Sequence, residues 1–240
     1  MKRLITLILL ASLSFCGYAS GDMELQEADI DPSNSESLQR GAKHFVTYCL
    51  GCHSVKHMRY QRMAQDFGID DKKVLKDIAI QGATIYDQLH TAMNKHDAEK
   101  WFGVQPPDLS LIGRSRGADW LYSYLKGFYN DKTKPLGTNN TVFKDVGMPN
   151  VFWELQGLQK PVFHLVDGQQ QIEKLVISEP GKLSEPAFDL MVNDLVNFLV
   201  YAGEPIQLER QRLGKYVLFF FLIFSVIAYK LKKEYWKDID

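Results

Sequence analysis

Two cysteines three residues apart, with a histidine directly after the second, constrain this chain more than any other feature. They are Cys49, Cys52 and His53, in the stretch HFVTYCLGCHSV at residues 44–55. The chain has three cysteines in 240 residues, and the third, Cys16, lies near the N-terminus. Three chemistries use such a pair: a redox dithiol, a structural zinc site, and the covalent attachment of a haem.

Zinc and a redox dithiol fit this pair poorly. A structural zinc site needs four ligands, usually from two such pairs, and the sequence contains no second Cys-x-x-Cys. A thioredoxin-like pair begins a helix that follows a strand, whereas here apolar residues with helical spacing precede the pair. These residues are Leu38, Ala42, Phe45, Val46 and Cys49. A helix is therefore predicted from about Ser35 up to the pair.

Covalent haem attachment requires this spacing. Two thiols on one turn reach the two vinyl groups of one porphyrin edge, and the next residue is placed to bind the iron through its imidazole. The sequence therefore predicts one haem c, bound through Cys49 and Cys52, with His53 as an iron ligand.

The iron needs a further ligand on its opposite face, and Met148 is the best candidate. It stands far downstream in the loop DVGMPN, between a glycine and a proline. Other candidates either follow His53 too closely, lie on an apolar helix face, or fall in a polar stretch. They are Met58, Met63, His57, Met191, Met93, His90 and His96. Ligation by His and Met raises the potential and suits electron transfer.

The N-terminus has the layout of a secretory signal peptide, predicted here as residues 1–21. Lys2 and Arg3 form a basic start, an apolar run follows at 4–15, and small residues come next. The run is too short to span a bilayer as an uncleaved anchor. Cys16 raises the alternative of a lipoprotein, but the preceding Phe15 fits the small residue expected there poorly.

A second apolar stretch, GKYVLFFFLIFSVIAYKLKKEYW, lies near the C-terminus. It predicts a transmembrane anchor helix at 210–231, because 213–231 spans the hydrocarbon core if its flanking lysines reach outward. A buried core helix is the alternative. Lysines crowd the tail at 232–240, and the positive-inside rule places this tail in the cytoplasm.

The region between these ends, residues 22–209, is predicted to be one exported domain. It carries 19 Lys and Arg against 26 Asp and Glu, a formal charge of −7. An acidic domain can steer a basic soluble partner in a salt-sensitive way. The sequence has no excess of positive charge that would suggest nucleic-acid binding. Five segments are predicted: an extended lead-in at 22–34, a helix at 119–129, a loop at 130–151, a hairpin at 162–178 and a helix at 186–203. The polar stretch DQLHTAMNKHDAEK is a candidate solvated helix.

These segments together resemble one family, cytochrome c1, the haem subunit of the cytochrome bc1 complex. The resemblance covers most of the chain, and rests on RGAKHFVTYCLGCHSV, WFGVQPPDLSLIGRSRGADWLYSYLKGFY, DVGMPNVFWELQG, the helix ending YAGEP and the C-terminal anchor. It implies a mainly α fold, with a cytochrome c-like haem domain of long loops and a small hairpin. It also implies one transmembrane helix in the bacterial inner (plasma) membrane, with the haem domain in the periplasm.

The resemblance also implies roles for individual residues. Iron is bound by His53 and Met148, Arg116 faces a haem propionate, Pro106 and Pro107 line the ring, and Trp120 and Tyr124 belong to its aromatic surround. Each has a plainer reading, as a surface arginine, loop-stiffening prolines or ordinary core. Some members carry a disulfide in the long loop before the methionine, and here no cysteine is left for one. Other packing must stiffen 130–147, which we predict to be where proteolysis begins.

The implied function is a membrane-anchored carrier of single electrons, from the Rieske iron–sulfur protein to a soluble or tethered cytochrome c. The chain would catalyse no reaction alone. Cytochrome b and membrane lipid are further expected partners, nucleic acid is not, and complexes of this family are dimeric. Two other hypotheses remain: a stand-alone tethered cytochrome that feeds an oxidase or peroxidase, and a haem-based sensor with a displaceable sixth ligand.

Overall fold

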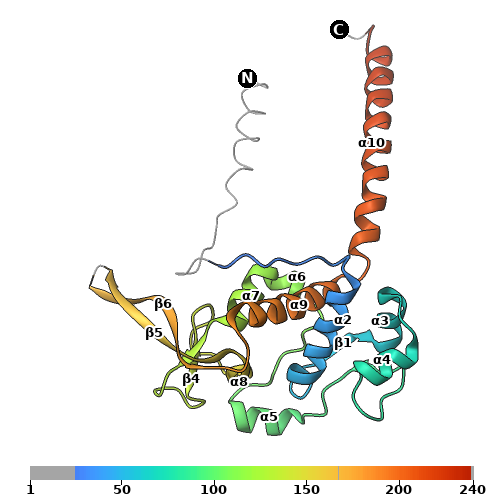
Figure 1. The fold of residues 1–240 in the computed structure, drawn as a ribbon. Helices are drawn as coiled ribbons and strands as arrows, with labels where there is room; N and C mark the ends of the chain where they lie inside the picture. The colour runs from blue at the N-terminus through green and yellow to red at the C-terminus, as the bar shows by residue number, and fades with distance from the viewer. Residues whose placement is uncertain (1–24, 167, 239–240) are drawn as a thin grey trace.

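The computed structural model describes residues 25–166 and 168–238, and most of their regular structure is helical (Figure 1). The predicted signal peptide, residues 1–21, lies outside the described residues. The helices are α2 (Ser35–His44), the π-helical turn η1 (Phe45–Cys49), α3 (Tyr60–Phe67), α4 (Asp71–Asp77), α5 (Lys95–Phe102), α6 (Ile112–Arg116), α7 (Ala118–Lys126), α8 (Trp153–Gln156), α9 (Glu185–Gly203) and α10 (Gln207–Tyr235). The strands are β1 (Val55–Arg59), β2 (Gln88–Leu89), β3 (Phe128–Asn130), β4 (Thr138–Asn140), β5 (Gly157–Val166) and β6 (Gln169–Pro180).

The centre of the domain is a close crossing of α2 and α9, the two helices that apolar spacing predicted. A Cβ atom on Gly41 would lie 2.0 Å from the carbonyl oxygen of Asp194, so the backbones touch where no side chain fits. At the same crossing, Arg40 donates from Nε and Nη2 to the two carboxylate oxygens of Asp194, at 2.6 and 2.9 Å. A buried carboxylate needs such a partner, because burial without one is costly. One face of α9 supplies much of the core: Phe188, Val192, Leu195, Val196, Phe198 and Leu199.

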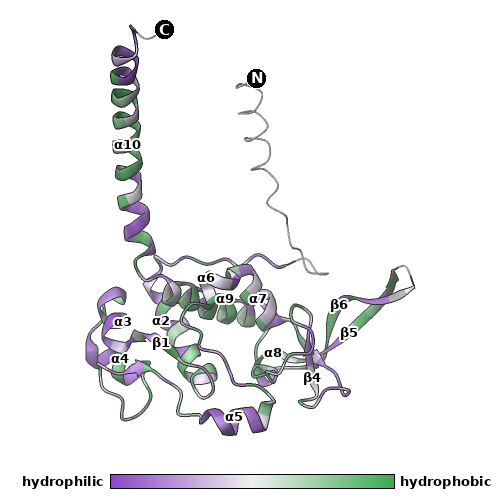
Figure 2. Cartoon of the chain, turned by 180° about the vertical axis from the view of Figure 1, so that it is seen from behind, coloured by the Kyte–Doolittle hydropathy of each residue, from purple (hydrophilic) through white to green (hydrophobic). Residues whose placement is uncertain are grey.

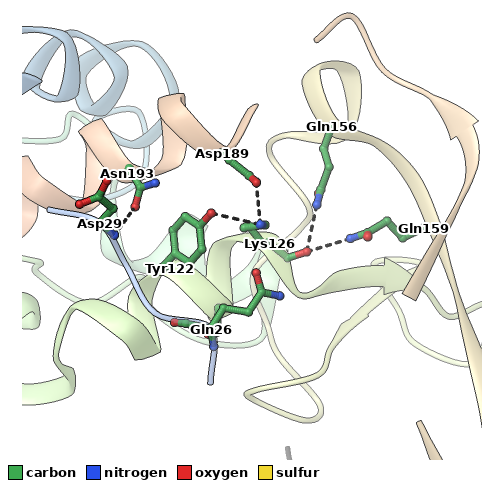
Figure 3. A network of polar contacts seen from close by, with 9 residues as sticks. Gln26, Asp29, Tyr122, Lys126, Gln156, Gln159, Asp189 and Asn193 are labelled. Atoms are coloured by element: carbon green, nitrogen blue, oxygen red, sulfur yellow. Dashed lines mark hydrogen bonds and ion pairs between the residues drawn. The ribbon is translucent and has the colours of Figure 1, made fainter. Parts of the chain in front are cut away.

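The lead-in before α2 is extended, as predicted, and runs along the body as a strap. The backbone N–H of Gln26 donates to Ser123 Oγ at 2.8 Å. The backbone N–H of Asp29 donates to Asn193 Oδ1 at 3.1 Å (Figure 3). These bonds attach residues far apart in sequence, on α7 and α9, to one segment. The strap therefore holds the two helices side by side.

Lys126, at the end of α7, is the centre of a polar network (Figure 3). Its Nζ forms an ion pair with Asp189 Oδ1 at 2.6 Å and donates to the hydroxyl of Tyr122 at 3.1 Å. Its carbonyl accepts from Nε2 of Gln156 at 3.0 Å and of Gln159 at 2.8 Å. The network joins α7 to α9 and to the base of the β5–β6 hairpin, and so fixes the end of a helix that carries predicted site residues.

Three antiparallel strand pairs complete the fold: β1–β2, β3–β4 and β5–β6. The hairpin predicted at 162–178 is confirmed, and it is longer than predicted because pairing extends from Gly157↔Pro180 to Val166↔Gln169. The helix predicted at 119–129 ends at Lys126, because the chain turns at Gly127 and pairs as β3 with β4. The stretch 130–151 is therefore not all loop, since it contains β4. In the polar stretch 87–100, the helix begins only at Lys95, where the Asn94 side chain caps its N-terminus.

The C-terminal helix α10 projects from the body and is exposed along its length (Figures 1 and 2). Of the helices in the described residues, it is the one long and apolar enough to cross a membrane. At the junction with α9, the carboxylate of Glu204 accepts from Arg114 of α6 at 2.6 Å and from Arg210 of α10 at 2.5 Å. These two ion pairs join α6 and α10 to the residue that follows α9.

Candidate haem site

The two cysteines of the motif lie at the end of a helix, as predicted. The helix α2 continues into the π-helical turn η1, a local irregularity that is frequent at functional sites. The N–H groups of Cys52 and His53 both donate to the carbonyl of Cys49, at 3.0 and 2.8 Å. This turn keeps the three residues together, and both cysteines are free thiols.

The environment of the thiols is unlike that of a redox dithiol. Burial, with a smaller effect of the neighbouring Cys52, raises the pKa of Cys49 to about 12. Burial also raises the pKa of Cys52. A reactive dithiol instead has a lowered pKa on its attacking cysteine. In the part of the chain that the structure describes, no three His, Cys, Asp or Glu residues cluster so as to hold a metal ion by themselves, as a structural zinc site would.

His53 has one ring nitrogen engaged with the protein backbone. Its Nδ1 lies 2.8 Å from the carbonyl oxygen of Pro107. Because a carbonyl only accepts, Nδ1 carries the proton and Nε2 keeps its lone pair for a metal. Burial lowers the pKa of His53, against smaller raising effects of this hydrogen bond and of Asp108, so the ring favours the neutral form that a metal requires.

The segment around Pro106 and Pro107 is bound to the strand that follows the motif. The N–H of Leu109 donates to the carbonyl of Ser54 at 2.8 Å, and the N–H of Lys56 donates to Asp108 Oδ2 at 3.2 Å. Pro106 and Pro107 line a cavity of about 250 Å³ together with Cys52. The structure thus brings both prolines next to the motif, although they lie more than fifty residues after it in the sequence. The sequence predicted this proximity only through the resemblance.

Met148 lies against an aromatic residue of α7. The hydroxyl of Tyr124 donates to its Sδ at 3.4 Å. Trp120, one turn earlier, stacks on Tyr124 with ring centroids 4.9 Å apart, and the guanidinium carbon of Arg116 lies 4.9 Å from the Trp120 ring centroid. Burial raises the pKa of Tyr124 to about 12, so its hydroxyl keeps the proton that it donates. Four predicted site residues therefore form one continuous row: Arg116, Trp120, Tyr124 and Met148.

The segment that carries Met148 is held near the motif on both sides. Before it, a Cβ on Gly147 would lie 2.8 Å from Cγ1 of Val104, in the chain that leads to the two prolines. After it, the ring of Phe152 packs edge-on against Tyr48, the residue preceding Cys49, at 5.5 Å between centroids. The contacts on the two sides of Met148 thus lead back to the motif, one through Val104 and one through Tyr48.

The other candidate iron ligands fall into two groups. Met58, Met63 and Met191 are buried in the core, where they pack as apolar side chains. Met93 and His90 line the cavity beside Cys52 on the side of Pro107, the residue that already binds His53. His57 is exposed, and so is His96 at the start of α5. Sequence reasoning missed the carbonyl of Pro107 as the partner of His53, because a backbone contact leaves no signal in residue type.

These residues fit a haem of the c type. The chain offers two free thiols on one turn, a histidine whose Nε2 lone pair is available, and a methionine thioether with a tyrosine beside it. The arrangement is that of a c-type cytochrome, an electron-transport haem protein.

The chain belongs to the Cytochrome C1 family, whose model matches residues 28–239. It is 48% identical to cytochrome c1 of Allochromatium vinosum over 100% of both chains. It is 45% identical to the protein named ammonia monooxygenase gamma subunit of Nitrosomonas europaea, over 99% of each. It is also 24% identical to cytochrome b/c1 of Bradyrhizobium diazoefficiens, over 84% of this chain and 33% of that protein. Members of the family are membrane-anchored electron-transfer subunits of the bc1 complex, with cytochrome b and the Rieske protein.

Proposed function

We propose that this chain binds one haem c through Cys49 and Cys52, with His53 and Met148 as the two iron ligands. In this role it accepts single electrons from the Rieske iron–sulfur protein and delivers them to a cytochrome c. The observation that carries the proposal is the hydrogen bond between His53 Nδ1 and the Pro107 carbonyl, which favours the tautomer whose Nε2 keeps its lone pair. When bound, the haem supplies a reversible one-electron couple.

The side chains around this site would hold and orient the two iron ligands and line the haem. The bond to Pro107 sets the ring orientation of His53 and makes it a stronger electron donor. Tyr124 holds the Met148 thioether by its second lone pair, and Trp120 stacks behind it. The prolines Pro106 and Pro107 give the other side an apolar, rigid lining, and Arg116 supplies a cation for a propionate. Soft thioether ligation favours the reduced state.

The topology that we propose follows from the two ends of the chain. Residues 1–21 act as the signal peptide, 22–209 form the haem domain in the periplasm, 210–231 cross the bacterial inner membrane, and 232–240 remain in the cytoplasm. The helix α10 is exposed along its length in the isolated chain, which agrees with a helix that lipid and cytochrome b would cover in the membrane. The assembly is a dimer of such complexes, and no nucleic acid takes part.

The acidic body favours a basic electron acceptor. Residues 22–209 carry a formal charge of −7, with 19 Lys and Arg against 26 Asp and Glu. Association with a basic cytochrome c is then fast at low salt and slows as ionic strength rises. The chain alone transfers electrons and catalyses no reaction; ubiquinol oxidation belongs to the whole complex.

Purification from detergent-solubilised membranes tests this assignment. We expect a b-type cytochrome and an iron–sulfur protein to copurify with the chain. Recovery without them, in contact with an oxidase or peroxidase, would instead support a stand-alone tethered cytochrome. Recovery with an ammonia-oxidising enzyme would support the role that the name of the Nitrosomonas relative suggests.

The iron ligand is tested by Met148→Leu. We expect the haem to remain covalently attached, the midpoint potential to fall, and the reduced protein to bind carbon monoxide. An unchanged potential and spectrum would reject Met148 as the ligand. Strong carbon monoxide binding by the unmodified protein would indicate a sensor with a displaceable sixth ligand.

A further inference from the structure

Two adjacent asparagines, Asn139 and Asn140, are buried in the loop that leads to Met148. Each is only 2% exposed, although asparagine is usually a surface residue. A buried amide is tolerated when its polar atoms are hydrogen-bonded. Here each side chain makes three bonds, and every one of them holds the loop or the helix that faces Met148.

Asn139 fixes the backbone three residues before Met148. Its Oδ1 accepts from the N–H of Asp145 at 2.8 Å and from the N–H of Asn140 at 2.9 Å, and its Nδ2 donates to Asp131 Oδ2 at 3.1 Å. Asp145 has a φ of 60°, and is the single non-glycine with positive φ in the described residues. That conformation is unfavourable for an L-residue and persists only where surrounding contacts hold it.

Asn140 connects the same loop to the helix that carries Tyr124. Its Oδ1 accepts from the N–H groups of Val142 at 2.9 Å and Phe143 at 3.1 Å. Its Nδ2 donates to the carbonyl of Tyr124 at 2.8 Å. The same tyrosine donates from its hydroxyl to Met148 Sδ. One amide therefore ties the loop to the residue that contacts the sulfur.

The backbone approach at Gly127 makes this arrangement tight. The N–H of Thr141 donates to the carbonyl of Gly127 at 3.0 Å. A Cβ at Gly127 would lie 2.4 Å from Oγ1 of Thr141 and 2.8 Å from the carbonyl oxygen of Ser123. The loop thus lies directly on the end of α7, and a shift of either would move Met148 relative to Tyr124.

We infer that Asn139 and Asn140 are positioning residues for Met148, which hold its sulfur in place as the sixth iron ligand. The inference rests on the proposed function, since it takes Met148 as that ligand. Loss of either side chain lets Asp145 leave its unfavourable conformation or separates the loop from α7. Met148 then leaves the iron more often, although haem attachment through the two cysteines is unaffected.

The test uses the full-length haem protein in detergent, as Asn139→Ala and Asn140→Ala. We expect full haem attachment, a lowered midpoint potential, and carbon monoxide binding to the reduced protein increased by about tenfold or more, since several buried hydrogen bonds are lost. Asn140→Ser serves as a milder variant if Asn140→Ala folds poorly, because a serine hydroxyl can still accept from the N–H of Val142 but cannot donate to the carbonyl of Tyr124. A smaller increase is expected for it.

Asn197→Ala is the matched control. Asn197 is 1% exposed, and donates to the carbonyl of Asp31 and to Ser37 Oγ, far along the sequence from the Met148 loop. We expect it to lower stability without changing carbon monoxide binding or potential. An equal effect in this control, or no effect in the Asn139 and Asn140 variants, would overturn the inference.

Met148→Leu, measured in parallel, separates the two levels of the argument. If it changes the potential and the asparagine variants do not, the positioning role fails and the ligand assignment stands. If Met148→Leu changes neither the midpoint potential nor carbon monoxide binding, the ligand assignment and the positioning role fail together.

Discussion

The hydroxyl of Tyr124 donates a hydrogen bond to the sulfur of Met148 at 3.4 Å. A thioether sulfur has two lone pairs, so it can accept this bond and still offer one pair to a metal. In the proposed role of Met148 as iron ligand, this bond would withdraw electron density from the sulfur and weaken its donation to oxidised iron more than to reduced iron. Tyr124 of α7 would then tune the ligand.

Tyr124→Phe is expected to lower the midpoint potential. A hydrogen bond contributes ~1 kcal/mol, and tenfold in a one-electron equilibrium is about 59 mV, so the fall should be at most about 40 mV. Redox titration followed by haem absorbance measures it. Tyr122→Phe is the control, because its hydroxyl accepts from Lys126 on the same helix. A potential that moves equally in both variants would contradict the specific role of Tyr124.

Gly41→Ala should strongly destabilise the domain, because the new methyl group would meet the carbonyl oxygen of Asp194 at 2.0 Å. Backbone atoms on α9 can give way only by separating the two helices, so we expect a loss of about 3 kcal/mol and a Tm lower by about 10 °C. Thermal unfolding followed by circular dichroism measures this. Gly214→Ala, in a helix with open space around the glycine, should leave Tm unchanged or higher. Equal behaviour of the two variants would reject the tight crossing.

Stability should fall as the pH is lowered from 7 to 5, in part through His44. Burial lowers the pKa of His44 in the folded state. Asp194 raises this pKa by a smaller amount, while Arg40 and Lys43 lower it further. Below about pH 6.5 the unfolded chain therefore binds a proton that the folded chain resists, and unfolding is favoured. Urea midpoints at the two pH values measure the effect.

His44→Gln should reduce this difference between pH 7 and pH 5. His164→Gln, at an exposed position on the hairpin, should retain it. A full pH effect in the His44 variant would show that other groups carry it.

Limited proteolysis should first cut the loop at 130–147. Lys132 and Lys144 are exposed there, while the asparagines between them are buried. Trypsin is expected to cleave after one of these lysines before it cleaves elsewhere in residues 25–206, and mass spectrometry of the first fragments identifies the site. Early cleavage confined to another segment would count against this prediction.

Local sequence patterns predicted much of the fold. Apolar spacing located α2 and α9, turn residues located the β5–β6 hairpin, and hydropathy located α10, because each signal is carried by residues near one another in the chain. The prediction failed at 127–130 and 138–140, where β3 and β4 pair. Short strands of this kind depend on a partner across a loop, and their residues have no periodicity long enough to read.

The sequence by itself determined which chemical groups are present: two thiols and an imidazole at fixed spacing, a methionine between glycine and proline, and an apolar C-terminal stretch. Only the tertiary structure decided how these groups are oriented. The carbonyl of Pro107 on His53, the hydroxyl of Tyr124 on Met148, and the amides of Asn139 and Asn140 behind the loop all join residues distant in sequence. Such contacts depend on backbone atoms and side-chain directions, which are fixed only when the helices pack.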